Sequence, residues 1–142
     1  MSVVITELPK SVAIRLGRDP SVIRLTPHVG YMGLVLDPKV RGKRKHVMGG
    51  KVYRIVGCGG LVWEQGMCWL WLGDVDAKRA PAVTVVRMAK NMLDRAKQLG
   101  ERTVYAARDE FPNSAKLLTL VGFKKLPDHP ALDGRELWAW PT

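Results

Sequence analysis

Two cations and a hydroxyl group stand at the start of the clearest helix that the sequence predicts. Lys78 and Arg79 come just before Pro81, a residue that suits the first turn of a helix predicted over 81–99. Such a turn leaves backbone N–H groups unpaired and carries the positive end of the helix dipole. Together with the Thr84 hydroxyl, these groups favour binding of a phosphate-type anion. The alternative is an ordinary helix start with two solvated cations.

A second concentration of charge lies in the run 39–46, which reads Lys-Val-Arg-Gly-Lys-Arg-Lys-His. The whole chain of 142 residues has a net charge of +10, which favours an anionic partner such as nucleic acid, a polyphosphate cofactor or an acidic protein surface. The run contains no aromatic residue on which a base would stack, so nucleic acid is the less favoured partner. The plain alternative for the run is a solvated loop.

The two cysteines and the hydropathy narrow the class of protein. A hairpin predicted around 64–67 places Cys68 opposite Trp63, with Cys58 too far along the strand to form a disulfide, so we expect two buried, reduced thiols. Neither a second cysteine pair nor a histidine cluster suggests a metal site. No segment has the roughly 18 apolar residues of a membrane span, and no signal peptide is evident at the N-terminus. We therefore expect a cytoplasmic protein of one domain, 1–142, without a membrane partner.

The elements around these groups follow from periodicity and turn residues. The helix over 81–99 has apolar residues at helical spacing and Gly100 at its C-terminal end. The preceding strand 67–72 is apolar on both faces, which indicates a central strand, and the strand–helix–strand order favours a parallel neighbour. Glycines 57, 59 and 60 indicate a bulge or a close approach by another group. Strands are predicted at 3–6, 30–36, 52–56 continuing as 61–64, 103–107, 123–126 and 136–140, and short helices at 11–16, 21–25 and 113–121.

This element order and three local features resemble the GNAT acetyltransferase superfamily, in a small, divergent form of a bacterial or phage type. Gly122-Phe123 after the short helix resembles the family's "A-x-x-L-Y-x-x-x-G-F" element, with Ser114 at the alanine and Leu117 at the leucine position. Ala96 to Gly100 resembles its "A-x-x-x-G" helix end, and Asp74-Val75-Asp76 its "V-D-P" lead-in. The resemblance spans 51–142. It implies an α/β (α+β) fold with a central, mixed but mostly antiparallel sheet flanked by helices.

The resemblance also implies a site for acetyl-CoA and a transfer of its acetyl group to an amine. The pantetheine arm would lie between the strands 67–72 and 103–107, which would separate near Leu72 to Val75. The backbone N–H of Val75 would face the thioester oxygen, and the diphosphate would lie on the helix start. The residues implied in cofactor binding are Leu72, Gly73, Val75, Lys78, Arg79, Ala82, Val83 and Thr84.

Catalysis would further require a base for the amine, and the sequence offers several. Glu110 and Asp74 are preferred because each follows the end of a separating strand, where an acceptor would enter. Glu64, Asp76, Asp109 and His46 stay open as alternatives. The acceptor would be an amine, for which an acidic protein surface, such as one of a host protein, fits the basic chain.

Two positions depart from the family's pattern. The phosphate loop "R/Q-x-x-G-x-G/A" is represented by Arg79 to Thr84 without any glycine, and Leu118 stands at the position of the usual tyrosine acid. These departures keep two other functions open: a non-catalytic GNAT-like module that binds a host or virion protein, and a nucleic-acid-binding domain. A homodimer through the C-terminal strands is a further open alternative.

Overall fold

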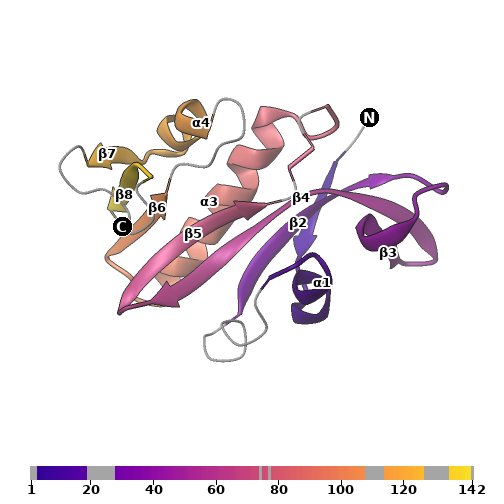
Figure 1. The fold of residues 1–142 in the computed structure, drawn as a ribbon, viewed down its shortest axis with the longest axis horizontal. Helices are drawn as coiled ribbons and strands as arrows, with labels where there is room; N and C mark the ends of the chain where they lie inside the picture. The colour runs from indigo at the N-terminus through magenta and orange to yellow at the C-terminus, as the bar shows by residue number, and fades with distance from the viewer. Residues whose placement is uncertain are drawn as a thin grey trace.

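The computed structural model describes residues 3–18, 28–73, 75–76, 78–107, 114–126 and 135–141. Its strands form one sheet with the order β1-β2-β4-β5-β6-β8-β7, and β3 pairs with β4 off this path (Figure 1). The strands are β1 (Val4–Glu7), β2 (Val29–Leu36), β3 (Lys45–Met48), β4 (Lys51–Glu64), β5 (Met67–Gly73), β6 (Thr103–Ala107), β7 (Lys124–Leu126) and β8 (Leu137–Pro141). The helices are α1 (Lys10–Arg15), the 3-10 turn η1 (Gly42–Arg44), α3 (Ala82–Gln98) and α4 (Ser114–Val121).

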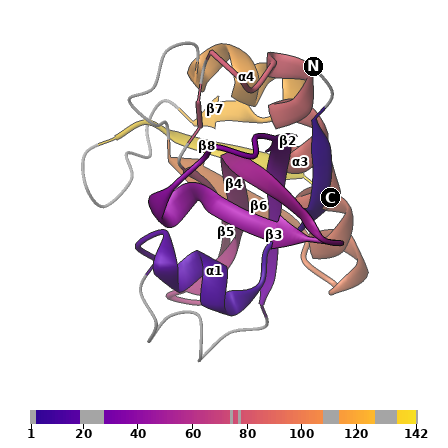
Figure 2. The same ribbon diagram turned by 90° about the vertical axis from the view of Figure 1, so that its right-hand side faces the viewer.

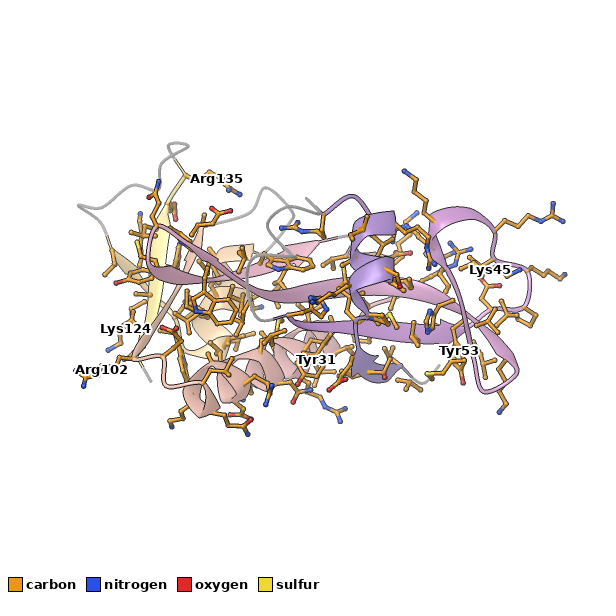
Figure 3. The ribbon with its side chains drawn as sticks, turned by 90° about the horizontal axis from the view of Figure 1, so that it is seen from below. Tyr31, Lys45, Tyr53, Arg102, Lys124 and Arg135 are labelled. Carbon is orange, nitrogen blue, oxygen red and sulfur yellow. The ribbon has the colours of Figure 1, made fainter. Side chains whose placement is uncertain are left out.

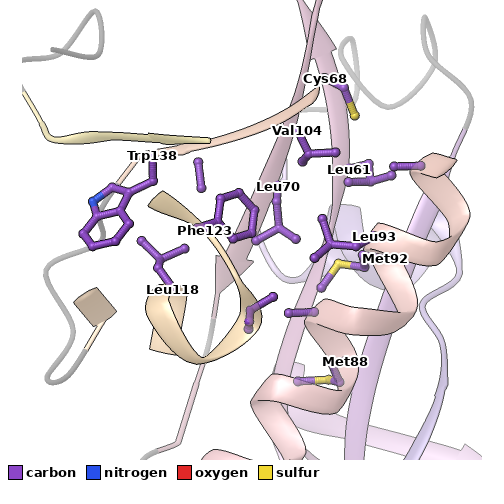
Figure 4. Packing of buried hydrophobic residues seen from close by; sticks show 14 of the residues in the cluster. Leu61, Cys68, Leu70, Met88, Met92, Leu93, Val104, Leu118, Phe123 and Trp138 are labelled. Atoms are coloured by element: carbon purple, nitrogen blue, oxygen red, sulfur yellow. The ribbon is translucent and has the colours of Figure 1, made fainter. Parts of the chain in front are cut away.

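Helices cover both faces of this sheet, as the two views in Figure 1 and Figure 2 show. The long helix α3 packs with α4 on one face through a core that contains Met88, Met92, Leu70 and Phe123 (Figure 4). The short helix α1 packs on the other face, where Val12 and Ala13 join a second cluster with residues of β2 and β4. The fold class predicted from the sequence, a mixed and mostly antiparallel sheet flanked by helices, is confirmed.

The strand β4 has a register shift against β2 just before its three glycines, because Gly33 pairs with Gly57 but Leu34 pairs with Ile55. This irregularity is the predicted bulge, and packing explains two of the glycines. A Cβ atom on Gly60 would lie 2.4 Å from the carbonyl oxygen of Val29 and 2.9 Å from the indole nitrogen of Trp71. A Cβ on Gly59 would meet the side chains of Leu72 and Met92 at 2.8 Å each. Glycine is therefore required at both positions because neighbouring strands and side chains approach closely, as predicted.

The tight hairpin between β4 and β5 is also as predicted, with Trp63 opposite Cys68. Gln65 and Gly66 both have positive φ angles, 54° and 74°, which is the pattern of a type I′ turn. Both cysteines are buried, and neither forms a disulfide within the described part of the chain. Burial raises the pKa of the Cys68 thiol to about 12, with the carboxylate of Glu101 as a smaller cause. The prediction of reduced, structural thiols is confirmed.

The basic run differs from a simple loop. Its middle, Gly42–Arg44, forms η1, and its last two residues enter β3, which pairs antiparallel with the start of β4. Gly49 and Gly50, with φ angles of 59° and 76°, connect the two strands. The Gly-Gly pair supplies the positive φ angles that such a turn needs, so the strand extends into the charged segment. The predicted helix 21–25 lies outside the described residues.

Candidate functional site

The strands β5 and β6 diverge, and an apolar cleft lies between their ends. They are parallel neighbours, as predicted, but pair only at Cys68 with Val104 and at Trp69 with Tyr105. The strands therefore stop pairing after Trp69, so their separation begins two residues before Leu72, the point near which it was expected to start. The cleft is narrow, with a cavity volume of about 30 Å³, and it is open to solvent. It is lined by Leu70, Leu72, Val85, Ala89, Ala106, Ala107, Leu117, Leu118, Val121 and Phe123.

A bulge follows the end of β5 beside this cleft, where Val75 packs against a cluster that includes the lining residues Val85 and Leu117. Gly73 pairs with Cys58, so an unbroken ladder would place Val75 opposite Val56. Instead the N–H of Asp76 donates to the carbonyl oxygen of Val56 at 2.8 Å. The segment that follows β5 therefore has one residue more than the stretch of β4 opposite it. Within the described part of the chain, no acceptor bonds the N–H of Val75. The bulge therefore leaves a backbone donor free beside the cleft.

The start of α3 supplies two more free donors. Pro81 precedes the helix in an extended conformation, and no side chain caps the helix start. The N–H groups of Thr84 and Val85 both donate to the carbonyl oxygen of Pro81, at 2.9 and 3.3 Å. Ala82 and Val83 are exposed, and their N–H groups have no acceptor among the described residues. An anion approaching this end of the helix would meet these two groups first.

Thr84 lies on the buried side of the first turn of α3. The residue is only 6% exposed, and its methyl group faces Gly33 of β2. The rotation of the helix sets this orientation, because Thr84 and Val85 both occupy the buried side of the turn. The backbone N–H groups of Ala82 and Val83 are thus the exposed donors at this helix start, and the contact of the Thr84 hydroxyl with a diphosphate stays a prediction.

The two predicted cations differ in their partners. The guanidinium of Arg79 forms an ion pair with Asp76 at 2.8 Å, and the backbone N–H of Lys78 donates to the same carboxylate at 3.0 Å. The side-chain hydrogen bond from Arg79 is the main cause that holds the pKa of Asp76 below its usual value. Asp76 is therefore an ionised anchor of the turn before α3 and a weak candidate for a base. Lys78 remains exposed close to the helix start.

The preferred bases, Asp74 and Glu110, lie outside the described residues, as does Asp109. Of the other candidates, His46 on β3 pairs with Tyr53 of β4, three residues before Val56, the partner of Asp76 at the bulge. Three residues of strand span about 10 Å, too far for direct proton transfer at the bulge. Glu64 stands at the hairpin end of β4, six residues beyond Cys58 in the opposite direction. Neither side chain reaches the bulge.

Leu118, at the position of the family's tyrosine, is nearly buried and lines the cleft (Figure 4). Its neighbours in the cleft wall are apolar, including Leu117 and Val121. Among the described residues that line the cleft, none carries a titratable side chain. The cleft is therefore suited to an apolar chain, and its walls offer no group to protonate a leaving thiolate.

Sequence reasoning missed one pair of residues beside the bulge. The guanidinium carbon of Arg18 lies 3.8 Å from the centroid of the Trp71 ring. A Cβ atom on Gly73 would lie 3.7 Å from that ring and 4.0 Å from Nη1 of Arg18. The two residues are 53 positions apart, so no local pattern relates them. A lone arginine behind a short helix carries no signal of its own in the sequence.

The basic β3–β4 hairpin lies at the other end of the molecule. Figure 3 shows Lys45 at one end, with Lys124 and Arg102 at the other. Between residues 37 and 54 there are seven lysines and arginines and one acid, Asp37, which Arg54 binds at 2.8 Å. The side chain of Arg15 on α1 donates to the carbonyl oxygens of Lys43 and Lys45. The hairpin is thus fixed to the body as a positively charged surface separate from the cleft.

Solved structures share this arrangement at low sequence identity. The ribosomal-protein-S18-alanine N-acetyltransferase from Escherichia coli matches with a TM-score of 0.58 and 14% identity, over 99% of this chain and 94% of that chain. A GNAT-family acetyltransferase from Staphylococcus aureus Mu50 matches with a TM-score of 0.62 and 13% identity, over 99% of both chains. A chain of the NatC complex bound to Gag peptide and CoA matches with a TM-score of 0.64 and 11% identity, over 100% and 99%.

The chain therefore has the fold of the GNAT acetyltransferases, as the resemblance implied. No protein-family model matches it, and no curated protein matches its sequence. In the ranges that the structure describes, no helix is long and apolar enough to cross a membrane. The same residues contain no group of three or more histidine, cysteine or acidic side chains that would hold a metal ion.

Proposed function

We propose that this protein binds acetyl-CoA in the cleft between β5 and β6 and transfers the acetyl group to an amine. The observation that carries the proposal is the free N–H of Val75 at the bulge, placed beside an apolar cleft. The thioester of acetyl-CoA supplies an activated acetyl group when it is bound. The fold is shared with a protein named as an acetyltransferase and with a chain of the NatC complex, which was solved with CoA and Gag peptide.

Each part of the cleft has a role in this proposal. The apolar walls around Leu70 and Leu72 suit the pantetheine arm, which brings few charges of its own. The N–H groups of Ala82 and Val83 and the charge of Lys78 suit the diphosphate. Arg79 contributes mainly by fixing the turn through Asp76. Gly73 keeps the space beside the bulge open, because it has no side chain there.

At the bulge the N–H of Val75 would donate to the thioester oxygen as negative charge develops on it. The amine nitrogen forms a bond to the acetyl carbon, the carbon–sulfur bond breaks, and the nitrogen loses a proton. We assign that proton to a carboxylate, Asp74 or Glu110, which follow β5 and β6 in the sequence. The sulfur leaves as a thiolate, a tolerable leaving group because a thiol has a pKa near 8.5. Leu118 in the tyrosine position is compatible with that route.

A second candidate is a module that binds a partner protein without catalysis. Leu118 favours it because leucine cannot donate a proton, and the ion pair of Asp76 with Arg79 favours it because a lowered pKa makes that carboxylate a weaker base. This candidate retains the fold and has no need of turnover. The two functions differ in one measurable product, the acetylated amine.

Thermal unfolding with and without acetyl-CoA tests the proposal, with CoA and ATP as comparison ligands. Acetyl-CoA at 100 times its dissociation constant stabilises a protein by about 2.7 kcal/mol, which corresponds to a rise of roughly 8 °C here. We expect this rise with acetyl-CoA and CoA and little with ATP. Mass spectrometry of a peptide mixture incubated with acetyl-CoA then separates the two candidates. Binding without any acetylated product would favour the non-catalytic module, and no binding would contradict the cleft as a cofactor site.

A further inference from the structure

Arg18 lies three residues after the end of α1, and its backbone is fixed by the way in which that helix ends. Its backbone N–H donates to the carbonyl oxygen of Ala13 at 3.0 Å, and Gly17 before it has a φ angle of 102°. This is the bonding of a Schellman motif, which ends the helix and fixes the direction of the chain. The fixed backbone and the contact with the Trp71 ring together hold the side chain in place. The guanidinium is therefore presented in one orientation.

Arg18 lies beside the proposed reaction centre, on the face opposite the cleft. Side chains alternate along β5, so Leu70 faces α3 and α4 while Trp71 faces the cluster beneath α1. The end of the Arg18 side chain is 4.0 Å from the position that a Cβ on Gly73 would occupy. Gly73 is two residues before Val75, the proposed donor to the thioester oxygen. An acceptor that reaches the bulge from the α1 face would pass this guanidinium.

Among the described residues, the Arg18 guanidinium has no partner of opposite charge. No carboxylate of these ranges pairs with the side chain and no carbonyl accepts a hydrogen bond from it, although the residue is half-buried. A partly desolvated arginine normally has its donors satisfied. Stacking on an indole ring leaves the N–H groups at the rim of the guanidinium plane available, in the fork geometry that fits a carboxylate. An anion carried by the acceptor would fit these N–H groups.

We propose that Arg18 binds a carboxylate of the acceptor, so that the acetylated amine belongs to a molecule with a carboxylate close to its reacting nitrogen. This inference rests on the proposed function and adds the class of acceptor to it. The net charge of +10 supports it, because it attracts acidic acceptors and repels polyamines. Two sources share this chemistry: a free amino acid, and a peptide N-terminus followed by an acidic side chain.

The experiment uses matched acceptors and three variants of the full chain. Each carboxylated acceptor is paired with its neutral amide: serine with serinamide, and a pentapeptide with glutamate at its second position with the glutamine version. Rates of acetylation give kcat/KM for each pair, and titration of the same compounds into CoA-saturated protein gives their dissociation constants. The variants are Arg18→Gln, Arg18→Lys and, as a control that removes one charge from α1, the exposed Lys10→Gln. Titration with CoA alone is done for every variant.

We expect one carboxylated acceptor to exceed its amide by 10- to 100-fold, the range that charge-assisted hydrogen bonds supply. R18Q should lose this preference, R18K should retain part of it, and K10Q should keep it, with the dissociation constant for CoA unchanged in all three. The pair that shows the preference identifies the source. Equal use of acid and amide by the unsubstituted protein, or a preference that survives in R18Q, would overturn the proposal. Failure of the unsubstituted protein to bind CoA would instead overturn the proposed function, which the separate CoA titration reports.

Discussion

The two edges of β5 differ in how far they are paired. Toward β4 the strand pairs at every one of its seven residues, from Met67 opposite Glu64 to Gly73 opposite Cys58. Toward β6 it pairs at two residues only. The first edge is closed by a tight turn and by glycines that let bulky neighbours approach, whereas the second opens into an apolar cleft. One strand thus serves as a rigid support on one side and as the wall of a site on the other.

The backbone geometry at the unpaired edge of β5 depends on the edge that is paired with β4. Val75 and its free N–H are held because Asp76 bonds to Val56 of β4 on one side and anchors the turn before α3 on the other. The site is therefore built from backbone groups whose positions the paired edge determines. Side chains with catalytic chemistry are scarce in the described part of the cleft, so changes to packing and to backbone donors provide the sharpest tests.

The largest effect on stability is expected from adding a methyl group at Gly60, in the part of β4 that pairs with both β2 and β5. In Gly60→Ala the new Cβ would lie 2.4 Å from the Val29 carbonyl oxygen, so β2 and β4 must move apart. We expect a loss of about 3 kcal/mol in the free energy of unfolding, measured by urea denaturation. Gly57→Ala is the matched control, because its Cβ would meet its nearest neighbour, Met88, at an ordinary 3.5 Å. Equal losses in the two variants would show that close approach at Gly60 is not the constraint.

A smaller effect is expected from removing one donor at the open edge. Ala82→Pro deletes the first free N–H of α3 at a position where helices accept proline, and Pro81 already has the extended conformation that a following proline requires. The dissociation constant for CoA should rise about tenfold in calorimetric titration, while the unfolding temperature without ligand stays the same. Lys10→Pro places the same change at the start of α1, also after an extended proline, and should leave CoA binding unchanged. CoA binding by A82P as tight as that of the unsubstituted protein would remove α3 from the site.

The smallest effect concerns the thiol of Cys68 on β5. Its pKa is about 12 in the folded protein and near 8.5 when the chain is unfolded, so the folded state retains a proton that the unfolded state loses. Stability is therefore complete below about pH 8.5 and decreases as the pH rises toward 12, by about 1.4 kcal/mol per pH unit. Urea denaturation from pH 8 to 10 should show a steeper loss than in Cys68→Ala. Parallel pH profiles for the two proteins would contradict the buried, protonated thiol.

Much of the secondary structure was predictable because local sequence patterns determine it. The apolar spacing between Pro81 and Leu99 predicted α3 within one residue at each end, and Gly66 predicted the hairpin. The hairpin formed by β3 was missed because its charged residues resemble a solvated loop, although Gly49-Gly50 marked the turn. The stacking of Arg18 on Trp71 had no local signal, since it depends on how α1 packs on the far face of the sheet.

For the candidate site, the sequence predicted the elements that carry its residues, with Leu72 and Gly73 at the end of β5 and Ala82 and Val83 at the start of α3. The separation of β5 and β6 was predicted from the resemblance, but its start two residues earlier depends on long-range pairing that a single sequence does not encode. The burial of Thr84 could not be predicted, because one position of rotation decides whether a residue in the first turn faces solvent or the sheet. Asp74 and Glu110 remain predictions.

The open edge of β5, and not the basic hairpin, is the proposed site for acetyl-CoA. A titration of ¹⁵N-labelled protein with CoA, followed through its backbone amide resonances, distinguishes the two surfaces. We expect the largest shifts at Leu72, Val75, Ala82 and Val83, with the amides of β3 and η1 unchanged. Shifts concentrated on the hairpin around Lys43 to Lys51, with the β5 and α3 amides unmoved, would contradict this proposal.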